Sequence, residues 1–253
     1  MKKMHVYSHT HWDYEWYFTA SESIIQLIYH MDEVISALES GTLKTYLLDS
    51  QVSILEEYLH MMPEKEPVIR KLVEEGKLMI GPWYTQSDEL IISGESLARN
   101  LWYGISYARE LGNCMMIGYL PDSFGHSWDF PKIFHQFGIK DFVITRGVGD
   151  DYKLGSEFYM KSNDGSELLV CTMIAGYGYG CYAFRNGTLF DESALDYNKI
   201  SVQSLIDRLL SYSTLDHEFV FPLGFDQNPA MLDIPKRIAE YNAQQTDIAF
   251  VST

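Results

Sequence analysis

Residues 4–41 read MHVYSHTHWDYEWYFTASESIIQLIYHMDEVISALESG, and this stretch decides the fold class. It starts with Met4–Ser8, a short apolar segment of strand length. After a polar turn, Ser21 or Ser23 is the expected N-cap of a helix, and Gly41 is expected just past its end. Apolar residues at spacings of three and four form the buried face of that helix: Ile24, Ile28, Met31, Ile35 and Leu38. The stretch is one strand–helix unit, the building block of a parallel sheet.

The same alternation continues to the C-terminus. Further strands are predicted at about 45–48, 78–80, 115–120, 141–145, 157–160, 168–173, 219–223 and 248–251, with the turn NDGS between the fifth and sixth of these. Helices are predicted between most of them. Six or seven parallel strands fit a (β/α) barrel or a barrel-like open sheet, and the absence of repeats and linkers predicts a single domain over residues 1–253. In either architecture ligands bind beyond the carboxyl ends of the strands.

Composition excludes several classes of partner. The chain has 35 acidic and 19 basic side chains, a formal net charge of −16, and 46% hydrophobic residues. This composition is typical of a soluble globular protein, and the charge repels nucleic acid and anionic membranes. Because the N-terminus lacks a signal-peptide pattern and no long apolar run follows, we expect a cytoplasmic protein. The three cysteines lack CxxC spacing, which disfavours a thiolate zinc site.

The first strand end carries candidate metal ligands. His9 and His11 alternate with Thr10, so both imidazoles are expected on one face, with Asp13 in the following turn. Imidazole and carboxylate are both good zinc ligands. The simpler alternative is a hydrogen-bonded His–Asp pair, and the segment alone leaves both open.

Two later strand ends carry carboxylates. Asp122 follows the strand at 115–120, where it either faces the same cavity or caps the next helix. Asp226 follows the strand at 219–223. Two carboxylates that converge on one cavity are typical of glycoside hydrolysis, although metal-assisted hydrolysis of other bonds also uses them. Aromatic side chains near the strand ends suit the apolar faces of sugars, but they are also ordinary core residues. They are Trp16, Trp83, Tyr84, Tyr177 and Tyr179.

Several motifs together resemble the α-mannosidases of glycoside hydrolase family 38. They are HTHWDYEW at 9–16, GPWYTQ at 81–86, PDSFGHS at 121–127, the strand-end Arg146, and PLGFD at 222–226. The residues HWD and GPWYTQ are most similar to those of the bacterial, cytoplasmic branch of the family. The resemblance implies a seven-stranded (β/α) barrel that binds one zinc ion and cleaves α-mannosides with retention. It also implies that this chain is the N-terminal part of the catalytic domain, without the family's fourth zinc ligand, a histidine further downstream. On that basis the isolated chain is expected to bind zinc weakly and to have little activity.

The resemblance implies a role for each matching residue. His11, Asp13 and Asp122 would bind zinc, and Asp122 would also be the nucleophile, while His9 would not be a ligand. Asp226 would be the acid/base. Trp16 would be the aromatic floor beneath the mannose, and Arg146 and Tyr179 would line the pocket. The substrate would be an α-mannosyl oligosaccharide or a mannoside of an anionic aglycone such as glycerate, and the full-length protein could be a homo-oligomer.

Three other functions fit parts of the pattern. Metal-dependent amidohydrolases also place an HxH pair after the first strand, and polysaccharide deacetylases also use Asp and His ligands. The third alternative is a non-catalytic, carbohydrate-binding fragment that keeps the aromatic side chains.

Overall fold

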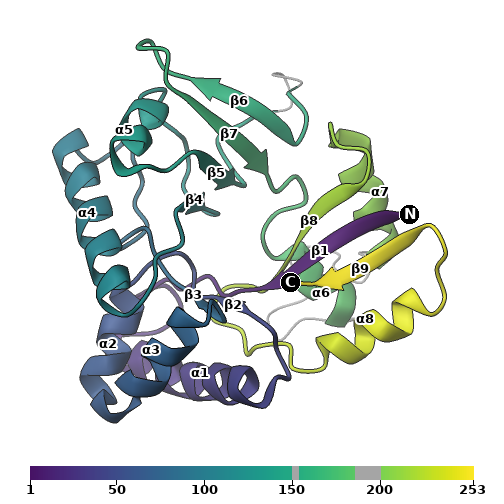
Figure 1. Ribbon diagram of the computed structural model, residues 1–253, viewed down its shortest axis with the longest axis horizontal. Helices are drawn as coiled ribbons and strands as arrows, with labels where there is room; N and C mark the ends of the chain where they lie inside the picture. The colour runs from purple at the N-terminus through teal and green to yellow at the C-terminus, as the bar shows by residue number, and fades with distance from the viewer. Residues whose placement is uncertain (150–153, 186–200) are drawn as a thin grey trace.

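The computed structural model describes residues 1–149, 154–185 and 201–253, and these residues alternate between strands and helices (Figure 1). The strands are β1 (Lys2–Ser8), β2 (Tyr46–Leu47), β3 (Leu78–Met79), β4 (Ile117–Leu120), β5 (Asp141–Ile144), β6 (Glu157–Lys161), β7 (Glu167–Thr172), β8 (Glu218–Leu223) and β9 (Ile248–Ser252). The helices are α1 (Ala20–Ser40), α2 (Ser53–Met61), α3 (Glu66–Glu74), α4 (Gly94–Glu110), α5 (Phe130–Phe137), α6 (Tyr179–Arg185), α7 (Val202–Tyr212) and α8 (Ile234–Asn242), with a 3₁₀ turn at Pro63–Lys65. The predicted α/β class is confirmed.

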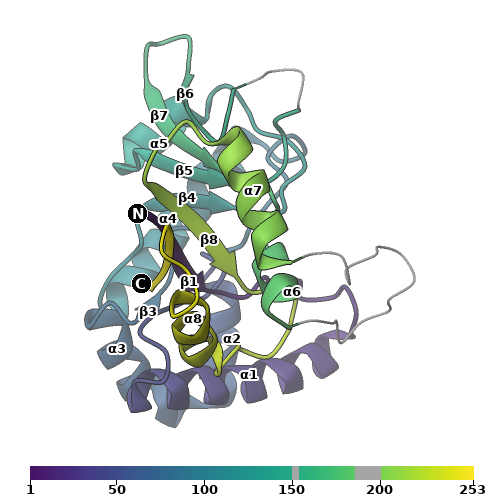
Figure 2. The ribbon, with the colours of Figure 1, turned by 90° about the vertical axis from the view of Figure 1, so that its right-hand side faces the viewer.

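The described strands form three separate sheets. One has the order β8-β1-β9 and is parallel throughout, and the second is the parallel pair β2-β3. The third has the order β4-β5-β7-β6, in which only β6 runs antiparallel. Helices surround the strands, with α1–α4 on the side opposite to α6, α7 and α8 (Figures 1 and 2). The carboxyl ends of β1, β2, β4 and β8 point toward one central region, which positions the candidate site.

The predicted closed seven-stranded barrel is wrong, because none of the described sheets closes on itself. Strands β2 and β3 are only two residues long, and a single backbone bridge, between His9 and Leu47, connects β1 to β2. Between β7 and β8 lies a cavity lined by side chains of both strands and of α7, so their backbones do not pair. Figure 1 shows the two larger sheets diverging on that side. Alternation in the sequence predicts strands, but it does not report whether neighbouring strands are long enough to hydrogen-bond.

Local signals around α1 and β6 were partly predictive. Gly41 ends α1 in the left-handed conformation, with φ 73°, as predicted. The predicted N-cap is wrong: Thr19 caps the helix, and Thr19 and Glu22 form a capping box. Ser23 is buried instead and accepts a hydrogen bond from the indole of Trp12. The predicted NDGS turn connects β6 and β7 as an antiparallel hairpin.

Helix α4 lies very close to the segment that follows β3. A Cβ atom at Gly104 would lie 2.2 Å from the carbonyl carbon of Trp83 and 2.3 Å from the carbonyl oxygen of Pro82. We therefore expect Gly104→Ala to lower the free energy of unfolding by about 2 kcal/mol, because backbone must move to accommodate the methyl group. Denaturant unfolding of Gly94→Ala is the matched control, since a Cβ there meets nothing within 4 Å. Equal stability of the two variants would contradict this packing.

None of the described helices is long and apolar enough to cross a membrane.

Candidate active site

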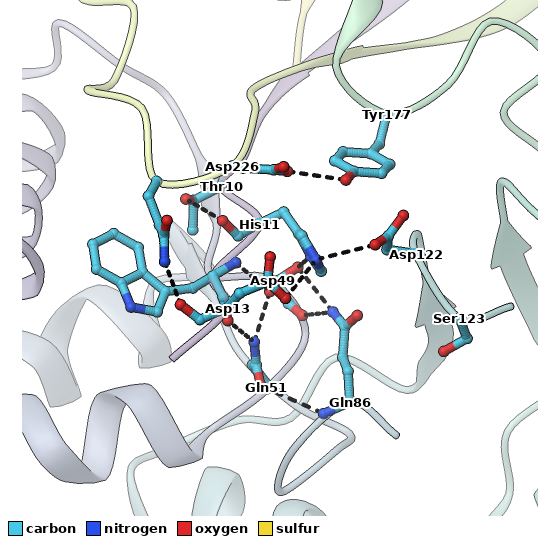
Figure 3. A network of polar contacts seen from close by, with 12 residues as sticks. Thr10, His11, Asp13, Asp49, Gln51, Gln86, Asp122, Ser123, Tyr177 and Asp226 are labelled. Atoms are coloured by element: carbon cyan, nitrogen blue, oxygen red, sulfur yellow. Dashed lines mark hydrogen bonds and ion pairs between the residues drawn. The ribbon is translucent and has the colours of Figure 1, made fainter. Parts of the chain in front are cut away.

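Four predicted site residues lie together at the carboxyl ends of three strands (Figure 3). His11 and Asp13 follow β1, Asp122 follows β4 and Asp226 follows β8. A backbone bridge between His11 and Asp226 extends the parallel pairing of β1 and β8 beyond the strand ends. Nε2 of His11 is 3.5 Å from Oδ1 of Asp13 and 4.0 Å from Oδ2 of Asp122. The four residues that were predicted from their positions after strands therefore lie close together in the structure.

The imidazole of His11 is buried among carboxylates. Its Nδ1 is 3.1 Å from Oδ1 of Asp49, while its buried Nε2 has no hydrogen-bond partner. Burial by itself lowers the pKa of His11, but the negative charges of Asp49 and Asp13 outweigh burial and raise that pKa well above its usual value. The surroundings of Nε2 therefore favour a positive charge at that point, whether a proton or a metal ion.

Asp49 is part of this group of side chains, although the sequence did not single it out. It lies two residues after β2, has a fully buried side chain and adopts a positive φ of 45°. Besides contacting His11, it accepts hydrogen bonds from Trp12 N, Gln51 Nε2 and Gln86 Nε2 at 2.7–2.8 Å. A carboxylate that orients a histidine through Nδ1 leaves Nε2 free to bind a metal. The signal was its position after a predicted strand, as for Asp122.

Asp122 is paired with a cation. The guanidinium of Arg146 approaches Oδ1 of Asp122 at 2.6 Å through Nε and 2.5 Å through Nη2. This arrangement leaves Oδ2 on the side of His11. The same guanidinium lies over the ring of Phe124, 4.7 Å from its centre. The alternative that Asp122 caps the next helix is wrong, because α5 begins eight residues later and Asp129 occupies its N-cap position.

Asp226 has a different environment. It is partly buried, and its Oδ1 accepts a hydrogen bond of 2.9 Å from the hydroxyl of Tyr177. Burial raises the pKa of Asp226 to about 6, and the negative charges of Asp13 and Asp122 act in the same direction. The nearby His11 and the Tyr177 hydroxyl act in the opposite direction. Asp226 therefore keeps its proton to a higher pH than an ordinary aspartic acid does.

The remaining predicted residues have fewer described contacts. Trp16 is 71% exposed and packs edge-on against Tyr17. Tyr179 begins α6, but its side chain lies outside what the structure describes. His9 is buried, and its two ring nitrogens face the backbone carbonyls of Thr10 and Tyr177 rather than the carboxylates. Trp83, one of the candidate sugar contacts, is a fully buried core residue.

The residues around His11 have the chemistry of a zinc site, although they do not surround a single point. Within residues 1–149, 154–185 and 201–253, no three His, Cys, Asp or Glu side chains converge as a metal-binding cluster. One buried imidazole nitrogen lacks a partner, however, and two carboxylates lie within 4.0 Å of it. One nitrogen and two carboxylate oxygens suit zinc, so the donor types fit this ion.

Comparison with known proteins decides the family. The model of the glycosyl hydrolases family 38 N-terminal domain matches residues 1–252. The chain belongs to glycosyl hydrolase family 38. A putative mannosylglycerate hydrolase of Halalkalibacterium halodurans is 32% identical over 98% of this chain and 28% of its own length. Alpha-mannosidase F of Dictyostelium discoideum is 28% identical over 64% of this chain and 16% of its own length.

The fold is also that of a family-38 protein. The crystal structure of an alpha-mannosidase from Enterococcus faecalis V583 matches all of this chain and 28% of that chain, with a TM-score of 0.88 and 29% identity. The chain spans less than a third of the length of each of these three proteins. Family 38 is a family of glycosidases, and this membership favours the glycosidase interpretation over the amidohydrolase and deacetylase alternatives.

Proposed function

We propose that the protein containing this chain is a retaining α-mannosidase in which Asp122 is the nucleophile and Asp226 is the acid/base. The observation that carries the proposal is the contrast between the two carboxylates. Asp122 is paired with the guanidinium of Arg146, whereas burial raises the pKa of Asp226 to about 6. Two carboxyl groups whose environments differ in this way are suited to opposite roles, one as anion and one as acid.

In the proposed reaction, an oxygen of Asp122 attacks the anomeric carbon of mannose while protonated Asp226 donates its proton to the leaving oxygen. This step forms a mannosyl ester on Asp122 and releases the aglycone. Asp226, now a carboxylate, removes a proton from the incoming water, which displaces Asp122 and regenerates both groups. The hydroxyl of Tyr177 holds Asp226 in place through both steps.

We propose that His11, Asp13 and Asp122 hold a zinc ion, with Asp49 orienting His11. When bound, the ion would supply positive charge that attracts and orients hydroxyl oxygens of the sugar. Asp49 supports the arrangement because it fixes the imidazole through Nδ1 and is itself held by Trp12, Gln51 and Gln86.

We propose that the substrate is a mannoside with a small anionic aglycone of the glycerate type. The name of the Halalkalibacterium halodurans relative, which aligns with 98% of this chain, supports this choice over an α-mannosyl oligosaccharide. We also propose that residues 1–253 are a single domain, since the main cluster of buried hydrophobic residues extends from Met4 to Phe250. Comparing turnover of mannosylglycerate and of α-mannobiose by the full-length protein tests the substrate.

The zinc proposal is tested by replacing Asp49 in the full-length protein. Asp49→Asn keeps the shape of the side chain but removes the charge that faces Nδ1 of His11, so we expect roughly 10- to 100-fold weaker zinc binding and similarly reduced turnover of an aryl α-mannoside. Elemental analysis and a zinc titration measure the first effect. Asp141→Asn, at the exposed start of β5, is the matched control. Unchanged zinc content and turnover in Asp49→Asn would contradict the zinc proposal. A wild-type product of inverted configuration would contradict the separate proposal of a retaining mechanism.

A further inference from the structure

A buried hydrogen-bonded pair, His126 and Glu89, contacts the backbone of Arg146. Nδ1 of His126 is 2.8 Å from Oε1 of Glu89, and Nε2 of His126 is 2.9 Å from the backbone carbonyl oxygen of Arg146. The two side chains are only 6% and 1% exposed. The mechanism proposed above uses neither His126 nor Glu89, although His126 belongs to the PDSFGHS motif and Glu89 lies three residues after the GPWYTQ motif.

The glycine at position 147 leaves room for His126 to lie against the backbone next to Arg146. A Cβ atom at residue 147 would lie 2.6 Å from Cδ2 of His126, and Gly147 has a φ of +88°. Only glycine fits that position without strain. The ring of Phe142 also meets the imidazole edge-on, with 5.1 Å between the ring centres. The backbone of Gly147 and this aromatic ring both lie against the imidazole.

The hydrogen bonds determine where protons lie on the pair. A carbonyl oxygen only accepts, so Nε2 of His126 carries a proton that it donates to Arg146. Nδ1 and Oε1 of Glu89 are 2.8 Å apart and would repel each other as two lone pairs, so a second proton lies between them. The other oxygen of Glu89, Oε2, is buried without a partner. His126 is therefore hydrogen-bonded to the buried carboxyl group of Glu89 and to the Arg146 backbone at the same time.

The same segment also holds the loop that follows Asp122. The carbonyl of Ser87 accepts a hydrogen bond of 3.0 Å from the hydroxyl of Ser123, and Oδ1 of Asp88 accepts one of 3.0 Å from the backbone N–H of Phe124. With the pair between Glu89 and His126, residues 87–89 make three side-chain-dependent contacts with residues 123–126. The loop between β3 and α4 is thus connected to both chain segments that position Asp122.

We propose that Glu89 and His126 are positioning residues that hold Arg146 against Oδ1 of Asp122, so that the carboxylate presents Oδ2 toward His11. This inference rests on the proposed role of Asp122. Both residues act through Arg146 and touch no reacting atom. Their loss lets the guanidinium and the Asp122 carboxylate rotate, so the chemical step slows while ground-state binding of the sugar is little affected.

The test compares three variants of the full-length protein on an aryl α-mannoside. For His126→Phe, which keeps a ring but donates no hydrogen bond, we expect kcat to fall about 10- to 100-fold with KM within about threefold of wild type. His126→Gln can still donate to the Arg146 carbonyl, and we expect it to recover most of kcat. His126→Phe leaves Glu89 buried and unpaired, so the double variant Glu89→Gln/His126→Phe provides a folded comparison with the same low kcat. Crystal structures report the separation of Arg146 and Asp122 independently of turnover.

His135→Phe is the matched control, because His135 also faces a backbone carbonyl, that of Glu167, at 2.9 Å but lies on α5 away from the site. A folded double variant with kcat within twofold of wild type and an intact contact between Arg146 and Asp122 would overturn the inference. So would equal kcat in His126→Gln and His126→Phe. If the wild-type protein hydrolyses no α-mannoside, the proposed function itself fails, and the inference fails with it.

Discussion

Asp122→Asn is expected to reduce kcat of the full-length protein on an aryl α-mannoside by about 10⁴-fold or more. The amide is close to the carboxylate in shape but cannot form the glycosyl ester through an anionic oxygen, so the double displacement loses its first step. It also gives up the ion pair with Arg146. The measurement is steady-state turnover, followed by mass spectrometry of wild-type protein trapped with a slow fluorinated mannoside, which should label Asp122.

The control for this variant is Asp129→Asn, seven residues further along the same segment. Asp129 is exposed and its side chain makes no capping bond to α5, so activity should stay near that of wild type. Label found on another residue, or Asp122→Asn turnover within tenfold of wild type, would rule out Asp122 as the nucleophile. Activity on N-acetylated sugars that Asp122→Asn abolishes would instead support the deacetylase alternative.

The second large effect concerns Asp226 and depends on the leaving group. Asp226→Asn should lower kcat/KM about 10³-fold for a mannoside with a poor leaving group, which needs protonation, and far less for a dinitrophenyl mannoside, which leaves as a stable anion. In the wild type, the acid must be protonated at the start of the reaction. Because burial raises the pKa of Asp226 to about 6, kcat/KM should fall as the pH rises through about 6.

The variant Tyr177→Phe tests whether the fall in kcat/KM near pH 6, called here the Asp226 limb of the pH profile, comes from Asp226. The hydroxyl of Tyr177 lowers the pKa of Asp226, so removing it should move the limb to higher pH by up to about one unit. Asp226→Asn should lack the limb altogether. Equal losses for good and poor leaving groups, or a limb that persists in Asp226→Asn, would assign the acid to another residue.

The sequence predicted the elements of this fold better than their assembly. Periodicity located the strand before His11, and Gly41 correctly marked the end of α1. Periodicity could not predict whether the sheet closes, because β2 and β3 are only two residues long and a cavity separates β7 from β8. Hydrophobic pattern reports which residues are buried, whereas closure depends on backbone hydrogen bonds between distant segments.

The part of the candidate site that could be predicted consists of residues that directly follow predicted strands. That rule singled out His11, Asp122 and Asp226, which the structure brings together. The same rule applies to Asp49, which follows the predicted strand at 45–48, but Asp49 was not among the predicted site residues. The contact between Glu89 and His126 could not be predicted either, because these residues are 37 positions apart and meet only when the loops that follow β3 and β4 come together.

Because the strands form three separate sheets, the polar side chains at their carboxyl ends also connect one sheet to another. Asp49 follows a strand of the smallest sheet, His11 one of the β8-β1-β9 sheet, and Asp122 one of the sheet that contains β4. Where no continuous ladder of backbone hydrogen bonds joins these sheets, side-chain contacts among the three residues act as cross-ties between them. A ligand that engages His11 and Asp122 would connect the sheet that contains β1 to the sheet that contains β4, so occupancy of the site and rigidity of the scaffold rise together.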